Sequence, residues 1–159
     1  MGTVVLGWDP DRGNRWNPSY DVSVRRCRDD HGVLERWPVG DWHLTPVGAD
    51  VHLMLQGRER GLIGRGVVRS APFLAGDPIH PGQVMHHVMV QWTTLLPLDR
   101  RIPIEALEAA VPELPWRSSY APAAALSPEG ALQLDLMWTT TGESAARRLT
   151  RSAWRLLRR

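Results

Sequence analysis

Hydrophobic and polar positions alternate in several short segments of the chain, and this pattern predicts β-strands. In residues 50–56, three aliphatic positions alternate with His52, Met54 and Gln56, as expected for a strand with one buried face. Glycine, proline or aspartate follows most of these segments, which places turns between them. The predicted strands cover residues 3–8, 33–37, 50–56, 61–69 and 84–92.

Other segments repeat hydrophobic residues every three or four positions, which is typical of an amphipathic helix. The first predicted helix lies within residues 17–32 and has Tyr20, Val24 and Cys27 on one face. Two other helices are expected over residues 104–111 and over residues 143–159. A further helix is expected after a capping Ser127, with Leu132, Leu136 and Met137 as its apolar positions. Because strands and helices do not alternate regularly, an α+β fold with a mixed or closed sheet is favoured over a doubly wound one.

Tryptophan is unusually frequent, with eight residues against one phenylalanine and two tyrosines. Three of them are expected to pack in the core or between helices: Trp92, Trp138 and Trp154. The other candidates lie in loops or at strand ends, where a core position and a surface pocket both stay open: Trp8, Trp16, Trp37 and Trp42. Indoles that face each other across a cleft can hold a flat base, at about 1–3 kcal/mol per stacked base.

The charge of the chain is nearly balanced, with 19 basic and 17 acidic residues and a formal net charge of +2. Every basic residue is arginine, a usage that a GC-rich genome produces without any functional reason. The arginines nevertheless cluster at residues 25–28, at residues 58–65 and in the last thirteen residues. Such clusters can follow a phosphate backbone even when the net charge is small.

Recognisable catalytic chemistry is missing from the sequence. Cys27 is the single cysteine, and the adjacent His86 and His87 point to opposite faces of a predicted strand. The sequence has no zinc-ligand spacing, nucleophile elbow or phosphate-binding loop. We therefore expect no enzyme activity, no metal and no cofactor. Because no apolar run approaches a membrane span and no signal pattern is present, a cytoplasmic location without a membrane partner is expected.

Several short motifs occur in an order that resembles EVE domains. They are Trp8-Asp9-Pro10 with Trp16, Arg36-Trp37-Pro38-Val39-Gly40, residues 48–53, Gln56-Gly57, Gly61-Leu62-Ile63-Gly64 with Gly66, residues 70–73, Leu95-Leu96 with Leu107, Trp116-Arg117-Ser118-Ser119 and residues 134–138. The similarity is greatest to the EVE-like domains fused to HNH nucleases in modification-dependent restriction enzymes, and it covers residues 4 to 138. Tyr120, where the family commonly has glycine, and the arginine-rich tail depart from the pattern.

This resemblance implies a PUA-like fold, related to YTH and SRA-type readers. The expected architecture is a mixed, curved β-barrel of about five or six strands surrounded by short helices. Residues 1–142 would form this domain, and residues 143–159 an arginine-rich C-terminal helix. By position, Trp37 matches the cage tryptophan, Phe73 a second aromatic, and Trp8 and Trp16 an N-terminal aromatic pair in the same cleft.

The implied function is the reading of a modified base, with 5-methylcytosine in double-stranded DNA as the expected ligand. The base must leave the duplex at a cost of a few kcal/mol, and one methyl group contributes only about 0.8 kcal/mol. Selectivity therefore needs a polar group at the base edge, for which the candidates are Asp9, Asn17, Asp77 and Gln83. The phosphate-binding candidates are Arg25, Arg26, Arg58, Arg60, Arg65, Arg117, Ser118 and Ser119.

Three other functions stay open at this point. The chain could be a PUA-like module that binds RNA, or an adaptor whose C-terminal segment binds a separate nuclease. It could also be an enzyme of the related ASCH type, although that family typically relies on a lysine and this sequence has none. The HNH nuclease part has no counterpart here, so the resemblance implies binding and not cleavage.

Overall fold

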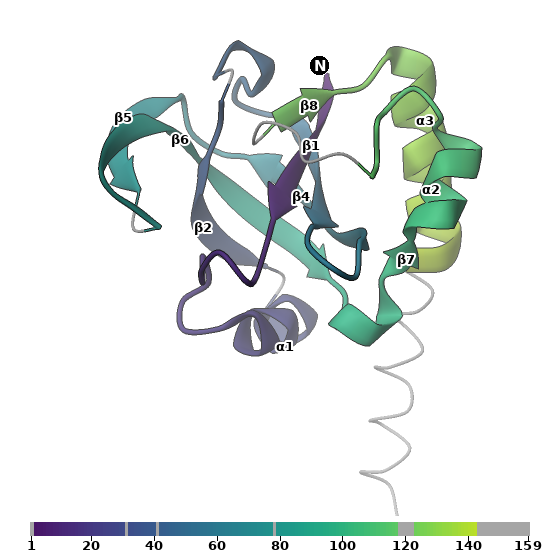
Figure 1. The fold of residues 1–159 in the computed structure, drawn as a ribbon, viewed down its shortest axis with the longest axis horizontal. Coiled ribbons are helices and arrows are strands. Elements are labelled where there is room, and N and C mark those ends of the chain that lie inside the picture. Colours follow the sequence, from purple (N-terminus) through teal and green to yellow (C-terminus); the bar gives the residue numbers. More distant parts are fainter. Residues whose placement is uncertain (1, 31, 41, 78, 118–122, 143–159) are drawn as a thin grey trace, which may run out of the picture.

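A computed structural model describes residues 2–30, 32–40, 42–77, 79–117 and 123–142, which form one sheet with helices on both sides (Figure 1). The strands are β1 (Thr3–Trp8), β2 (Val33–Pro38), β3 (Asp50–Leu55), β4 (Gly61–Val68), β5 (Phe73–Asp77), β6 (His80–Leu95), β7 (Ile102–Pro103) and β8 (Ala123–Ala125). The helices are α1 (Tyr20–Asp30), α2 (Ile104–Ala110) and α3 (Pro128–Met137).

The strands pair in the order β2-β6-β4-β3-β1-β8, while β5 also pairs with β6 and β7 with β4. β1 and β3 run parallel and the other pairs run antiparallel, so the sheet is mixed, as expected. The expected barrel of five or six strands is wrong. In the part of the chain that the structure describes, eight strands pair and the path ends at β2 and β8 without closing.

Two hydrophobic clusters lie on opposite faces of the sheet, and this explains the pattern of β3. Val51, Leu53 and Leu55 belong to the cluster on the α1 side, and Met54 belongs to the cluster under α2 and α3. His52 lies on the same side as Met54 and is also buried. β3 is therefore a central strand with both faces covered, and not the half-exposed strand that its alternation predicted.

α3 begins after Ser127, whose hydroxyl accepts a hydrogen bond from the Gly130 backbone N–H at 3.0 Å, so the predicted cap is confirmed. This start directs Leu134 and Trp138, one helical turn apart, into the core. Leu132 and Leu136, which were expected on the apolar face, are instead 57% and 53% exposed. The predicted helix over residues 143–159 lies outside the described residues, as does Tyr120.

β6 is longer than the predicted strand over residues 84–92 and positions the pocket described below. Its second half carries Val88, Val90 and Trp92 into the core and pairs with β2 and β4. Its first half extends beyond the core and pairs with β5, which the hydrophobic pattern did not predict, and it meets the end of β2 only at His87. The β5–β6 hairpin therefore projects past one edge of the sheet (Figure 1).

His52 is a neutral histidine held in the core. It is 1% exposed, its ring lies 5.8 Å from that of Trp138, and Arg65 is its partner across the β3–β4 pair. Burial, and then the positive charge of Arg65, lower the pKa of His52 to about 3.

None of the helices in the described ranges is long and apolar enough to cross a membrane.

We predict that His52 makes the fold sensitive to acid. An unfolded chain binds a proton on this imidazole near pH 6.5 and the folded chain only near pH 3, so stability is lost as the pH falls between these values. Between pH 6.5 and 4.5 the loss from His52 alone is about 2–3 kcal/mol. Urea unfolding at both pH values should show a smaller loss for His52→Gln, whereas the partly exposed control His86→Gln should behave like the unchanged protein. Equal losses in all three proteins would contradict this.

Candidate functional site

The tryptophans expected to form an open cage lie in the core. The Trp16 ring is 5.1 Å from Trp37, 6.1 Å from Trp92 and 5.6 Å from Trp8. Trp37 has no exposed surface and Trp16 is 3% exposed. Removing rings of this size from water stabilises the fold by about 2–3 kcal/mol each, which explains their position. The expected open slot between Trp37 and Phe73 is not formed.

Phe73 and Trp8 are placed elsewhere by their strands. Phe73 is the partner of His87 across the β5–β6 pair, and the two rings stack at 6.1 Å with 24° between their planes. Trp8, at the end of β1, is buried and donates its indole N–H to the Gly13 carbonyl at 3.0 Å. Neither ring lines the pocket described next.

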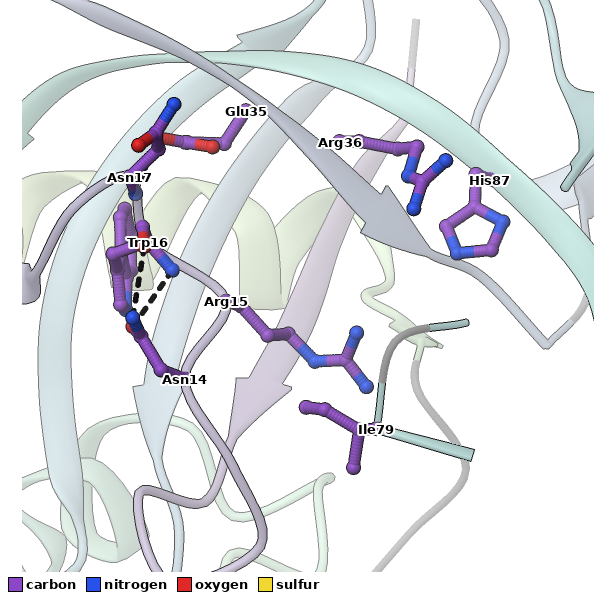
Figure 2. A pocket seen from close by; sticks show the side chains of 8 residues that line it. All are labelled: Asn14, Arg15, Trp16, Asn17, Glu35, Arg36, Ile79 and His87. Atoms are coloured by element: carbon purple, nitrogen blue, oxygen red, sulfur yellow. Dashed lines mark hydrogen bonds between the residues drawn. The ribbon is translucent and has the colours of Figure 1, made fainter. Parts of the chain in front are cut away.

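The loop between β1 and α1 is fixed around Trp16. The Asn14 amide donates to the carbonyls of Trp16 and Pro18 at 2.9 and 2.8 Å, and its oxygen accepts the Trp16 N–H at 2.9 Å. Because the indole of Trp16 is buried, the neighbouring side chains of Arg15 and Asn17 lie on its outer side (Figure 2).

These side chains form one wall of a pocket of about 410 Å³. The loop supplies part of the lining, β2 supplies two charged side chains, and the β5–β6 hairpin supplies the rest (Figure 2). The lining residues are Asn14, Arg15, Trp16, Asn17, Glu35, Arg36, Ile79 and His87. Of the expected base-binding residues, the pocket therefore brings together Trp16 and Asn17.

Arg15 joins this loop to the hairpin through a two-pronged ion pair with Asp77, at 3.1 and 3.2 Å. Asp77 is fully buried and also accepts from His80 Nδ1 at 2.9 Å and from the Ile79 N–H at 3.1 Å. Burial alone would raise the pKa of Asp77, but the hydrogen bonds from Arg15, His80 and Ile79 outweigh it and hold this pKa well below its usual range. Both carboxylate oxygens have partners, so Asp77 positions the wall and does not face the pocket.

Arg36 and Glu35 place opposite charges on the β2 wall. Arg36 donates to the Gly76 carbonyl at 3.2 Å, and no carboxylate within the described ranges pairs with its charge. Glu35 accepts the Asn17 N–H at 3.2 Å. Burial raises the pKa of Glu35, while the Asn17 N–H and the charge of Arg26 act in the opposite direction.

Two buried polar atoms among the lining residues have no hydrogen-bond partner in the described structure, namely Trp16 Nε1 and His87 Nε2. A buried polar atom without a partner costs about 1–3 kcal/mol. The indole nitrogens of the core residues Trp37, Trp92 and Trp138 share this state with Trp16, so only His87 Nε2 is expected to gain a partner when the pocket is filled. Burial, and then the charges of Arg36 and Arg15, lower the pKa of His87, although the Met85 carbonyl and Asp77 act against them. His87 is therefore neutral at pH 7.

A second pocket of about 370 Å³ collects arginines near the β3–β4 turn and the start of α2. It contains Arg58, Arg60 and Arg117, three of the phosphate-binding candidates, together with Arg101. Several of these charges are partly balanced: Arg117 lies 2.7 Å from Glu108 and 3.9 Å from Glu105, and Arg101 lies 3.7 Å from Glu59.

The other candidates are dispersed. Arg25 and Arg26 are exposed on α1, and Arg26 donates to the Asn17 carbonyl at 3.1 Å beside the first pocket. Arg65 forms a 2.8 Å ion pair with Asp135 of α3. Ser118 and Ser119 lie outside the described residues. Their phosphate-binding role stays a prediction.

Two of the polar candidates for the base edge lie away from the first pocket. Asp9 accepts the Asp11 N–H at 3.0 Å and borders Gly57, whose φ of 103° shapes the β3–β4 turn. Gln83 is exposed at the start of β6. Within the described ranges, no three histidine, cysteine or acidic side chains gather as metal ligands do.

The sequence did not indicate the pocket residues Arg15, Arg36 and His87. Arg15 could have been found from its position next to Trp16, because a buried tryptophan directs its neighbours outward. His87 had no such signal, since its place in the pocket depends on the pairing of β6 with both β2 and β5.

No protein-family model matches the chain, and no curated protein matches it in sequence. Several solved structures are similar in fold. A protein from Pseudomonas putida is 16% identical with a TM-score of 0.59, covering 84% of this chain and 97% of that one. The human THYN1 protein, in complex with DNA containing 5-methylcytosine, is 12% identical with a TM-score of 0.56, covering 89% and 98%. A variant of the ASCH protein from Zymomonas mobilis is 11% identical with a TM-score of 0.50, covering 84% and 96%.

At these identities the similarity shows the fold alone. It agrees with the expected α+β class, and nearly the full length of each similar structure is matched. The overall fold is therefore shared with other proteins. The pocket between the β1–α1 loop and the β5–β6 hairpin is described for this chain.

We predict that Asp77 is a major support of the pocket wall. In Asp77→Asn, Arg15 keeps its charge but loses its partner, and breaking such a buried pair costs about 3–5 kcal/mol. The exposed pair of Arg117 and Glu108 provides the control, because Glu108→Gln should cost less than about 1 kcal/mol. Urea unfolding at pH 7 measures both. A loss for Asp77→Asn no greater than that for Glu108→Gln would contradict the assigned role.

Proposed function

We propose that this chain is a non-catalytic nucleic-acid-binding domain that reads a modified base, with 5-methylcytosine in duplex DNA as its ligand. The observation that carries the proposal is the pocket between the loop of Trp16 and the β5–β6 hairpin, which is lined by His87, whose buried Nε2 has no hydrogen-bond partner among the described residues. Its volume of about 410 Å³ lies within the range of pockets that bind small molecules and is ample for one base.

The proposed binding mode differs from a cage of opposed rings. The extruded base enters between the loop of Trp16 and the β5–β6 hairpin, and its edge meets His87 Nε2. A hydrogen bond to this nitrogen contributes several-fold to affinity, which offsets part of the few kcal/mol that extrusion costs. The guanidinium of Arg36, which has no carboxylate partner among the described residues, is then suited to a flanking phosphate.

Two further observations support a reader of modified DNA. The human THYN1 structure with this fold is a complex with 5-methylcytosine-containing DNA. The order of short motifs over residues 4 to 138 also resembles the EVE-like domains of modification-dependent restriction enzymes. A relationship with those enzymes, and a separate nuclease as partner, belong to the proposal.

The central test is a gel-shift comparison of two duplexes that differ by a single 5-methyl group. Tighter binding of the methylated duplex is expected, by roughly fourfold from burial of the methyl alone. Turnover of either probe would contradict a non-catalytic role. Equal affinity for both duplexes would contradict the proposed reading of the methyl group.

Arg36→Ala is expected to weaken binding of both duplexes about equally and to reduce the slope of log affinity against log salt by about 1. The reason is the loss of one phosphate contact without a change in base recognition. Arg100→Ala, an exposed arginine distant in sequence from the pocket, is the matched control and should leave the slope unchanged. A slope that is the same in all three proteins would remove Arg36 from the interface.

A further inference from the structure

The second pocket, near the β3–β4 turn, brings like charges together. Four arginines line its volume of about 370 Å³, and they come from three segments that are far apart in the sequence. Arg58 and Arg60 belong to the turn, Arg101 precedes β7, and Arg117 follows α2. Positive charges that share one hollow repel each other, so this arrangement favours an anion between them.

Arg101 is held in place by the backbone around it. Its Nη1 donates a hydrogen bond to the Leu98 carbonyl at 2.9 Å. Its stem lies against β4, because a Cβ atom added at Gly61 would lie 2.9 Å from Arg101 Cγ and Cδ. A guanidinium has five N–H donors, so the bond to Leu98 orients the group and leaves most of its donors for another partner.

Arg60 is oriented by a residue of the core. Its Nη1 donates to the Trp116 carbonyl at 3.3 Å. Trp116 is itself fixed, since its side chain is fully buried and its indole N–H donates to the Val111 carbonyl at 2.7 Å. Two guanidinium groups of the pocket are thus positioned before a ligand arrives, which reduces the entropy lost when an anion binds.

The carboxylates near this pocket lie mostly in water and do not neutralise it. The Glu59 side chain is 73% exposed and lies 3.7 Å from Arg101, and the Glu105 side chain is 72% exposed and lies 3.9 Å from Arg117. Ion pairs of this length and exposure are weak. Arg117 has a closer partner, Glu108 at 2.7 Å, which does not line the pocket. The lining itself contains four arginines and two glutamates, an excess of two positive charges.

Phosphate is the anion that suits this pocket best. The fork of a guanidinium binds two oxygens of one phosphate group at once. Donors from three segments can also meet oxygens that point in several directions, which a tetrahedral phosphate offers and a planar carboxylate does not. Arg58, which is exposed and forms no ion pair within the described ranges, adds a further charge for such a ligand.

We propose that this pocket is a second binding site of the chain and that its ligand is a phosphate group, either in the backbone of a nucleic acid or as a terminal or free phosphate. The inference goes beyond the proposed function, because it needs neither an extruded base nor the pocket beside Trp16. It also adds Arg101, which the sequence did not indicate, to the phosphate-binding candidates.

The first experiment titrates the full chain with sodium phosphate at pH 7 and constant ionic strength. The backbone ¹H–¹⁵N signals of residues 57–61 report binding, and sodium acetate provides the planar anion as a control. Saturable shifts with phosphate, and much weaker binding of acetate, are expected. The absence of a saturable shift with phosphate, or equal binding of acetate, would overturn the proposal.

Two variants identify the residues that bind. The phosphate affinity should fall about tenfold in Arg101→Gln and, because water screens the more exposed Arg58, about threefold in Arg58→Gln. Arg100→Gln makes the same change of charge at an exposed neighbour that does not line the pocket, and it should leave the affinity nearly unchanged. Thermal unfolding checks the fold of Arg101→Gln, and the exposed Arg58→Gln keeps the test valid if that variant is destabilised. Equal affinities in all four proteins, or an equal loss in Arg100→Gln, would overturn the role of the pocket.

The second experiment distinguishes the sources of the phosphate with unmethylated duplexes that end in a 5′-hydroxyl or a 5′-phosphate. Tighter binding of the 5′-phosphate duplex, lost in Arg101→Gln, assigns a terminal phosphate. Equal binding of both duplexes, with a slope of log affinity against log salt that falls by about 1 in Arg101→Gln, assigns the backbone. Binding of inorganic phosphate, while neither duplex responds to the substitution, assigns a free phosphate.

The outcomes separate this inference from the proposed function. Equal affinity for methylated and unmethylated duplexes, with intact phosphate binding, overturns only the reading of the methyl group. A preserved preference for the methylated duplex, without phosphate binding to the second pocket, overturns only this inference.

Discussion

Burial of the Trp16 indole against Trp37 and Trp92 is the interaction on which the rest of the site depends. An irregular loop cannot hold side chains in fixed positions by itself, because its backbone has few regular hydrogen bonds. Here one large ring is anchored in the core, and its neighbours Arg15 and Asn17 are thereby directed to the surface. The same packing that stabilises the domain thus builds one wall of the pocket.

The opposite wall depends on the length of β6. Half of this strand is held between β2 and β4 over the core, and the other half carries β5 as a projecting hairpin. The Arg15–Asp77 ion pair fastens that hairpin to the loop, so the two walls keep their spacing. A rigid frame of this kind reduces the entropy lost when a ligand is bound, and it holds His87 Nε2 in place before the ligand arrives.

The sequence predicted the elements better than it predicted the site. Strands such as β3 and β4 and the Ser127 cap followed from alternation and capping, which are local properties. The closed barrel was wrong because closure depends on long-range pairing, and the exposed Leu136 was misjudged because the phase of α3 is set by where the helix starts. Trp37 illustrates the limit for the site: an indole suits a core and a binding pocket equally well, and only the pairing of β2 with β6 decides between them.

The central claim is that one base enters the pocket beside Trp16. Indole N–H signals in a ¹H–¹⁵N spectrum test it directly, because Trp16 lines the pocket, whereas Trp42 is 40% exposed and is not among the lining residues. On titration with duplex DNA containing 5-methylcytosine, the account predicts a shift of the Trp16 indole signal, as the base fills the pocket that this residue lines, and little change at Trp42. An unchanged Trp16 signal at saturating DNA would contradict the account.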